Sequence, residues 1–158
     1  MEDRRELLLI FRKDSGNRAS IRELYETRCA AIPRENGLYF VETSDGELCF
    51  VPDAAEPGIP AYPVAELQQK WEAGDRRCLY IGKAKRRGGL RKRLWEYIRY
   101  GYGLGKNHRG GRAIWLVRDF EALTICWEPV EDAEQMEHEL LRAYKNAYGC
   151  YPVANRRG

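Results

Sequence analysis

The sequence lacks any paired cysteine motif. Its five cysteines are widely spaced and odd in number, and no two of them form a Cys-x-x-Cys pair. Such spacing disfavours both a disulfide framework and a zinc cluster. We therefore expect a reduced, cytoplasmic protein whose thiols serve as small core residues.

Long apolar runs, internal repeats and linkers are also missing. No apolar stretch approaches the roughly 20 residues that cross a bilayer, so no membrane partner is expected. The longest early run, Leu7 to Phe11, is too short for a signal-peptide core. A hydrophobic content of 44% suits a folded chain. We predict one domain over residues 1–158, with one sizeable core.

The sequence does contain a concentrated basic block. Residues 76–118 hold fourteen Lys or Arg and one acidic residue, whereas the remainder holds thirteen basic and twenty-three acidic residues. The net charge of +3 hides this asymmetry. Trp95, Tyr97, Tyr100 and Tyr102 lie within the block, where they could stack on bases. The pattern favours a nucleic-acid-binding surface over an ordinary solvated charged face.

Local signals predict a mixture of short strands and helices. Helices are expected over 21–30, 64–72, 90–100 and 131–148, and strands over 38–42, 47–51, 78–81 and 123–127. A Ser-Asp-Gly turn should pair the first two strands as a hairpin, and residues 101–111 should form a mobile glycine-rich loop. The order indicates an α/β or α+β fold, with a small, largely antiparallel central sheet flanked by helices. Residues 1–35 are interpreted as an N-terminal helical extension.

Two strand tyrosines and one helical arginine are candidate functional residues. Alternation along the strands separates Tyr39 from Leu38 and Phe40, and Tyr80 from its own apolar neighbours. Both hydroxyls should then leave the core side by side, although ordinary packing is the alternative. Arg93 flanks the buried stripe of its helix, four residues before Tyr97. A guanidinium held there suits a phosphate group, or else a salt bridge.

The last helix carries a carboxylate in an unusual place. By helical periodicity, Glu137 falls within the apolar face. A carboxylate there is costly unless it is paired with a cation or coordinates a metal. We interpret it as a ligand of a divalent cation, with an ion pair to an arginine as the structural alternative. The proline turn after this helix could fold Asn155 back toward Glu137.

Together these residues resemble the GIY-YIG nuclease superfamily. Gly37-Leu38-Tyr39 corresponds to the first signature, with Leu38 where isoleucine is usual, and Tyr80-Ile81-Gly82 corresponds to the second. The runs 80–85 and 90–97 are similar to the N-terminal nuclease domain of the bacterial excision-repair incision subunit. Segments 108–115, 137–141 and 152–155 are similar to stand-alone prokaryotic members. The insertion over 43–76, between the signatures, resembles that of GIY-YIG restriction endonucleases.

The resemblance implies a one-metal mechanism. Glu137 would hold one Mg²⁺ or Mn²⁺ on the scissile phosphate, and Arg93 would stabilise the transition state. Tyr80, with Tyr39, would activate the attacking water, its pKa lowered by Lys83, Arg93 and the metal. Further site residues are Tyr97, as a proton-transfer or phosphate-contacting group, and Asn155, which would orient Glu137 or a phosphate. The predicted nucleic-acid contacts are Lys83, Lys85, Arg86, Arg87, Arg91, Lys106 and Arg112. Arg112 has a structural alternative as strand support.

We therefore expect a metal-dependent endonuclease acting on DNA, with RNA not excluded as a substrate. It would act as a monomer or a weak, transient homodimer. The alternative is a nucleic-acid-binding module that retains the fold without cutting. A purely structural or adaptor role is disfavoured by the basic block.

Overall fold

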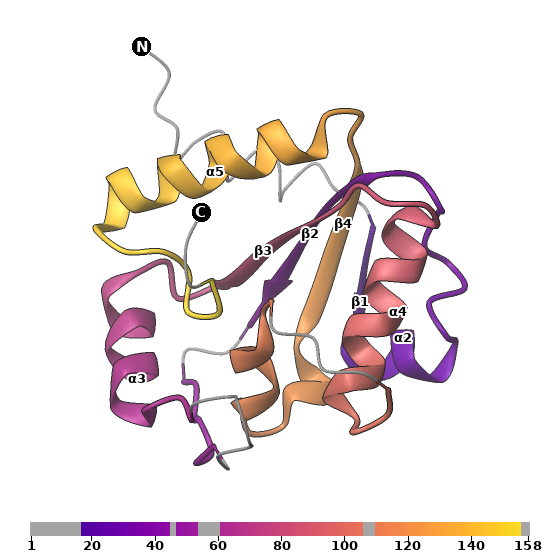
Figure 1. Cartoon of the computed structure of the whole chain (residues 1–158). Coiled ribbons are helices and arrows are strands. Elements are labelled where there is room, and N and C mark those ends of the chain that lie inside the picture. Colours follow the sequence, from indigo (N-terminus) through magenta and orange to yellow (C-terminus); the bar gives the residue numbers. More distant parts are fainter. Residues whose placement is uncertain (1–16, 45–46, 54–60, 106–109, 156–158) are drawn as a thin grey trace.

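The computed structural model describes residues 17–44, 47–53, 61–105 and 110–155. At its centre lies a four-stranded antiparallel sheet with the strand order β1-β4-β2-β3 (Figure 1). The strands are β1 (Arg18–Ser20), β2 (Gly37–Glu42), β3 (Cys78–Ala84) and β4 (Thr124–Pro129). The two strands with the signature tyrosines, β2 and β3, are neighbours, which brings the two motifs together.

Helices cover both faces of the sheet (Figure 1). They are α2 (Ile21–Glu26), α3 (Val64–Ala73), α4 (Gly89–Gly101) and α5 (Ala133–Tyr148), with 3₁₀ helices η1 (Arg112–Leu116) and η2 (Phe120–Ala122). Helix α5 packs on one face, whereas α4 and α2 lie on the other. The chain is thus a small α+β fold, as predicted.

The sheet separates two hydrophobic clusters because alternate residues of each strand face opposite sides. Leu38 and Phe40 of β2 pack with α5, while Tyr39 and Val41 join the cluster beneath α4. The signature tyrosines therefore stay in the core, whereas the sequence had suggested that they leave it. They line the second of two buried faces.

A bulge breaks the expected alternation in β3. Val41 pairs with Tyr80 and Glu42 pairs with Cys78, so Leu79 has no partner of its own in β2. As a result Leu79 and Tyr80 belong to the same cluster, contrary to the predicted separation. The bulge lies immediately before the tyrosine that the sequence marks as functional.

The predicted hairpin over 38–42 and 47–51 does not form. Strand β2 pairs instead with β3 and β4, which are distant in sequence. Within 47–53, the only bridge the structure describes joins Phe50 to Val117. Part of the predicted turn, residues 45–46, lies outside the described residues.

The helices agree better with the sequence. Helix α4 and helix α5 match their predictions closely, and Gly149 ends α5 in the left-handed conformation with φ of 78°. Helix α2 is shorter than predicted, because Arg28 and Cys29 adopt positive φ angles soon after it ends. The segment preceding it is a strand, β1, paired with β4, so part of the predicted N-terminal helical extension belongs to the sheet.

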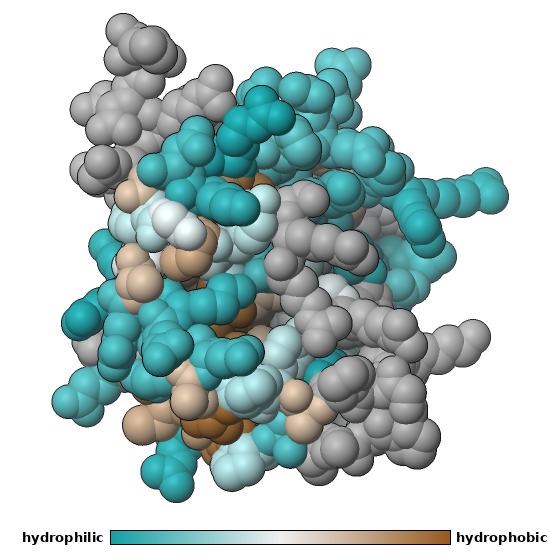
Figure 2. Space-filling view, turned by 60° about the vertical axis from the view of Figure 1, so that its left-hand side comes forward, coloured by the Kyte–Doolittle hydropathy of each residue, from teal (hydrophilic) through white to brown (hydrophobic). Residues whose placement is uncertain are grey.

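One face of the molecule is polar (Figure 2), and three of the five cysteines are buried. The face in Figure 2 is mostly hydrophilic, with hydrophobic side chains in small separate patches. Cys29, Cys78 and Cys126 are buried, as predicted for core thiols, whereas Cys49 is exposed and Cys150 half-buried. Within the described ranges, no helix has the length and apolar character needed to cross a membrane.

Candidate active site

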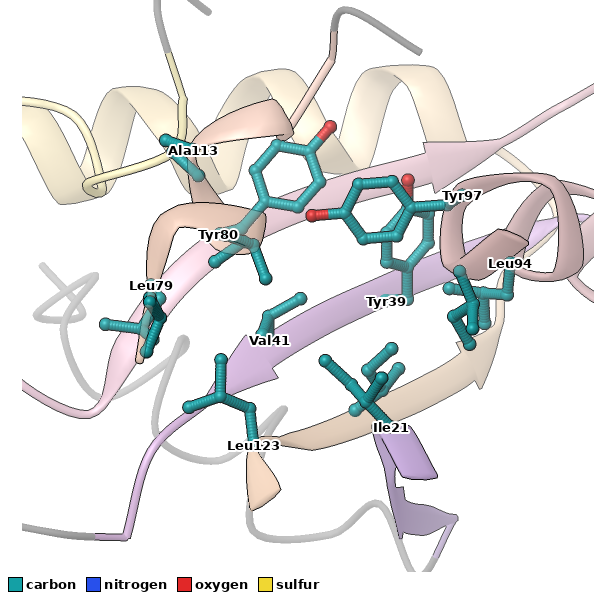
Figure 3. Packing of buried hydrophobic residues seen from close by; sticks show 14 of the residues in the cluster. Ile21, Tyr39, Val41, Leu79, Tyr80, Leu94, Tyr97, Ala113 and Leu123 are labelled. Carbon is teal, nitrogen blue, oxygen red and sulfur yellow. The ribbon is translucent and has the colours of Figure 1, made fainter. Parts of the chain in front are cut away.

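Three tyrosines from three elements form a compact triad. Tyr39 comes from β2, Tyr80 from β3 and Tyr97 from α4 (Figure 3). Their ring centroids lie 5.9 Å (Tyr39 and Tyr80), 6.1 Å (Tyr39 and Tyr97) and 5.8 Å (Tyr80 and Tyr97) apart. The prediction that the two strand tyrosines lie side by side is correct, and Tyr97 completes the group.

Glycines permit this close packing. A Cβ atom at Gly82 would overlap the ring of Tyr39, so the signature glycine is required by the neighbouring signature tyrosine. Gly111, with φ of 72°, lies against the ring of Tyr80 in the same way. Gly110 also borders the functional groups, since a Cβ there would lie 3.3 Å from Tyr80 Oη and 3.5 Å from an Arg93 guanidinium nitrogen.

Tyr97 anchors this glycine segment. Its ring is fully buried, and its hydroxyl donates to the Gly111 carbonyl at 2.7 Å. The hydroxyl is thus already engaged with protein. The geometry favours Tyr97 as a residue that positions the glycine segment over Tyr80, rather than the predicted proton-transfer or phosphate-contacting group.

A cleft of about 370 Å³ opens beside the triad. Its lining includes three of the predicted catalytic residues, namely Tyr80, Arg93 and Glu137. The remaining lining residues are mostly basic: Lys83, Lys85, Arg86, Arg87 and Lys92, with Ala84, Gly89 and Glu96. The structure therefore brings a phenol, a guanidinium and a carboxylate from β3, α4 and α5 to one strongly positive cleft.

The positive potential of the cleft comes from side chains. The first amides of α4 are already bonded, since Gly89 N donates to Arg86 O at 2.9 Å and Leu90 N donates to Glu35 O at 2.8 Å. Arg91 N and Lys92 N also have backbone acceptors. An anion in the cleft would thus contact guanidinium and ammonium groups rather than the helix amides.

The key carboxylate is paired with a lysine. Lys83 Nζ lies 3.2 Å from Glu137 Oε1 and 3.7 Å from Glu134 Oε1, and Lys85 Nζ lies 2.8 Å from Glu134 Oε1. The side chain of Glu137 is 15% exposed. Glu137 lies on the inward side of its helix, as predicted, although its side chain is not fully buried, and its ion-pair partner is Lys83 rather than an arginine.

The donor set suits a hydrated hard cation rather than an enclosed metal. Across the described ranges, no group of three or more His, Cys, Asp or Glu side chains is placed to hold a metal ion. One carboxylate, that of Glu137, is nevertheless enough for Mg²⁺, which keeps several waters and uses substrate phosphate oxygens. The buried hydroxyl of Tyr39 makes no hydrogen bond of good geometry with the described residues. It lies beside the cleft residues Tyr80 and Arg93, and both of them interact with it.

Burial controls the acidity of the triad. It raises the pKa of Tyr80 well above the ordinary value of 10.0, Tyr39 raises it further, and Arg93 offsets only part of the increase. Burial likewise raises the pKa of Tyr39 and of Tyr97. The protein groups alone therefore raise the pKa of Tyr80, whereas Lys83 and Arg93 together with a metal were expected to lower it, because removal from water outweighs the nearby positive charge of the side chains.

Asn155 holds the edge of the sheet instead of reaching the cleft. Its Oδ1 accepts from Ile81 N at 3.0 Å, and its Nδ2 donates to Ile81 O at 2.9 Å. Ala154 N also donates to Leu79 O at 2.9 Å, so the tail pairs along the outer edge of β3. From α3, Lys70 Nζ donates to Asn155 O at 2.8 Å. Asn155 thus supports the strand beneath Tyr80, and its amide is not free to orient Glu137.

Two predicted nucleic-acid contacts are engaged elsewhere. Arg91 Nε donates to Ile32 O at 2.6 Å and holds the turn before β2. Arg112 Nη1 lies 3.0 Å from Asp53 Oδ2 and its guanidinium carbon lies 4.5 Å from the ring centroid of Tyr62. Lys106 lies outside the described residues.

Sequence reasoning missed two groups that shape the cleft. Lys92 was not among the predicted site residues, but it is exposed and forms part of the lining. Gly110 was placed only within a glycine-rich loop. The signal for Lys92 was its place in the basic run Arg91–Arg93 near the start of α4. Nothing local in the sequence marks Gly110, because its role depends on contacts across the fold.

No protein-family model, curated protein or solved structure matches this chain. The resemblance to GIY-YIG nucleases therefore stays a prediction from short motifs. Tyr80, Arg93 and Glu137, which converge in the cleft, are the observation that bears on function.

Proposed function

We propose that the protein is a metal-dependent endonuclease that hydrolyses phosphodiester bonds in DNA. The observation that carries the proposal is the convergence of Tyr80, Arg93 and Glu137, from three separate elements, on one cleft rich in lysine and arginine. A nucleic-acid backbone is the anion that such a row of cations suits best. The three groups match the needs of phosphoryl transfer.

Each side chain has a distinct task in this proposal. Tyr80 orients the attacking water and, in its ionised form, takes up the proton of that water as attack proceeds. Arg93, held half-buried beside Tyr80, donates hydrogen bonds to the phosphoryl oxygens as their charge grows. Glu137 would hold the divalent cation, which supplies charge neutralisation at the phosphate and the leaving oxygen when bound.

Supporting residues keep these groups in place. Tyr39 packs against Tyr80 and covers Gly82, while Tyr97 holds the glycine segment over the phenol. Arg86, Arg87 and Lys92 line the cleft and would contact the phosphate backbone without choosing a sequence. The proposed specificity is therefore low.

A non-cleaving nucleic-acid-binding module is the second candidate. The observation that favours it is the pairing of Glu137 with Lys83 at 3.2 Å, which satisfies the carboxylate without a metal. In such a module the cleft would bind a phosphate backbone, and the tyrosines would only pack.

Cleavage assays separate the two candidates. Plasmid and single-stranded DNA would be incubated with Mg²⁺, Mn²⁺ or EDTA. The nuclease proposal expects metal-dependent cleavage that falls about a thousandfold in Glu137→Gln. Glu139→Gln is the matched control, because Glu139 lies exposed on the same helix and outside the cleft lining. Binding without cleavage under every metal would support the module instead.

A further inference from the structure

Lys83, the residue that follows the second signature, forms an ion pair with Glu137. Glu137 is the carboxylate that binds the metal in the proposed function. Lys83 Nζ is 3.2 Å from Glu137 Oε1, and the two side chains are 29% and 15% exposed. Both residues line the same cleft. A cation of the protein itself therefore lies where a divalent cation would bind.

We propose that Lys83 is an internal counter-ion that must leave Glu137 before a metal binds, and that an incoming phosphodiester draws it away. Nucleic acid and divalent cation would then bind cooperatively. This inference rests on the proposed function, because it requires Glu137 to be the metal ligand.

Electrostatics makes the two cations competitors. An ammonium and a divalent cation on the same carboxylate oxygen repel each other strongly at such distances. Because Glu137 is largely buried, solvent and salt screen this repulsion less than they would on an open surface. Metal affinity in the absence of nucleic acid should therefore be reduced by the energy of the ion pair.

The cleft offers Lys83 another partner once DNA is present. Its ammonium is carried on a flexible four-carbon chain, and the neighbouring lining residues Arg86, Arg87 and Arg93 attract phosphate to the same space. Glu134 does not depend on Lys83, because Lys85 Nζ lies 2.8 Å from it. A phosphate oxygen can thus replace Glu137 as the anion beside Lys83. By linkage, DNA would then raise metal affinity, and metal would raise DNA affinity by the same factor.

Mn²⁺ binding to the free protein tests the first half of the inference without any activity readout. Titration followed by the paramagnetic resonance signal of free Mn²⁺ should show weak binding to the wild type, about tenfold tighter binding to Lys83→Gln, and unchanged binding to Lys83→Arg. Lys85→Gln removes the same charge from the same cleft but not from Glu137, so its effect should be about twofold.

A DNA duplex tests the second half. In a Tyr80→Phe background, the duplex should tighten Mn²⁺ binding by a larger factor when Lys83 is present than after Lys83→Gln is added, because only the Lys83 protein has an ion pair with Glu137 for the phosphate to release. If Glu137→Gln abolishes Mn²⁺ binding but Lys83→Gln leaves it unchanged, the counter-ion inference fails and the metal site stands. If Mn²⁺ binding is absent, or does not respond to Glu137→Gln, the proposed function fails and the inference with it.

Discussion

The side chain of Asn155 forms both hydrogen bonds that a fifth strand would give to Ile81, with distances of 3.0 Å to the amide and 2.9 Å from Nδ2 to the carbonyl. Strand β3 lies at the edge of the sheet, so these backbone groups would otherwise lack a strand partner. Ile81 stands between Tyr80 and Gly82. One amide side chain from the C-terminal tail thus fixes the strand that presents the proposed water-activating phenol.

Replacement of Asn155 should therefore reduce stability. Asn155→Ala leaves two buried backbone groups unpaired, and we expect a loss of about 3 kcal/mol in the free energy of unfolding, measured with urea. Asn155→Asp should be at least as harmful, because it places a carboxylate against the Ile81 carbonyl. Full stability in Asn155→Ala, with loss of cleavage alone, would instead support the predicted contact with Glu137 or phosphate.

Much of the architecture was predictable because it depends on local patterns. Helical periodicity placed α4 and α5, and the inward position of Glu137 followed from that periodicity alone. The pairing of the strands could not be predicted from local patterns. Strand β2 pairs with β3 and β4 rather than with the predicted strand over 47–51, which is nearer in sequence. Side-chain packing on both faces of the sheet stabilises this pairing.

The candidate site was likewise predictable only in part. Residue types and order indicated Tyr80, Arg93 and Glu137, which the fold brings to one cleft. Charge alone did not reveal which arginines face solvent, because a guanidinium can equally satisfy backbone carbonyls or a buried carboxylate. Arg91 and Arg112 take these two other roles.

Arg112 provides a test of that distinction. Its side chain is 10% exposed and its partner Asp53 is 7% exposed, so removal of the guanidinium leaves a buried carboxylate unpaired. Arg112→Met should lower the free energy of unfolding by about 3 kcal/mol or more in urea denaturation. DNA affinity of the folded protein should stay the same. A stable Arg112→Met protein with weakened DNA binding would restore the predicted nucleic-acid contact.

The exposed arginines of the cleft should behave in the opposite way. Arg87 is exposed and lines the cleft, so Arg87→Gln should reduce the slope of log affinity against log salt by about 0.9 while leaving stability nearly unchanged. Fluorescence anisotropy of labelled DNA over a salt series measures the slope. Arg91→Gln is the comparison: we expect an unchanged slope and lower stability, since Arg91 holds Ile32 O at 2.6 Å. Equal slopes for wild type and Arg87→Gln would remove Arg87 from the binding surface.

Gly110 should affect the access of water and phosphate to Tyr80 rather than the stability of the fold. An alanine Cβ would lie 3.3 Å from Tyr80 Oη and 3.5 Å from the Arg93 guanidinium, which narrows the space where water and phosphate meet. We expect Gly110→Ala to reduce the rate of cleavage at least tenfold, with a change in unfolding free energy within about 0.5 kcal/mol. Single-turnover cleavage and urea unfolding give the two values. Unimpaired cleavage would show that the reacting groups do not approach Tyr80 from this side.

The pH dependence of cleavage tests the role of Tyr80. Burial raises the pKa of Tyr80 well above 10.0, so the phenol is neutral near neutral pH and its ionised fraction grows with pH. If ionised Tyr80 accepts the proton of the attacking water, the single-turnover rate should increase about tenfold per pH unit from neutral pH upward. Tyr80→Phe should be slow and should lose this slope, whereas Tyr97→Phe should retain it, because the Tyr97 hydroxyl is bonded to Gly111 O. Retention of the wild-type pH slope in Tyr80→Phe would assign the proton transfer to another group, and Tyr80 would then serve only to orient the water.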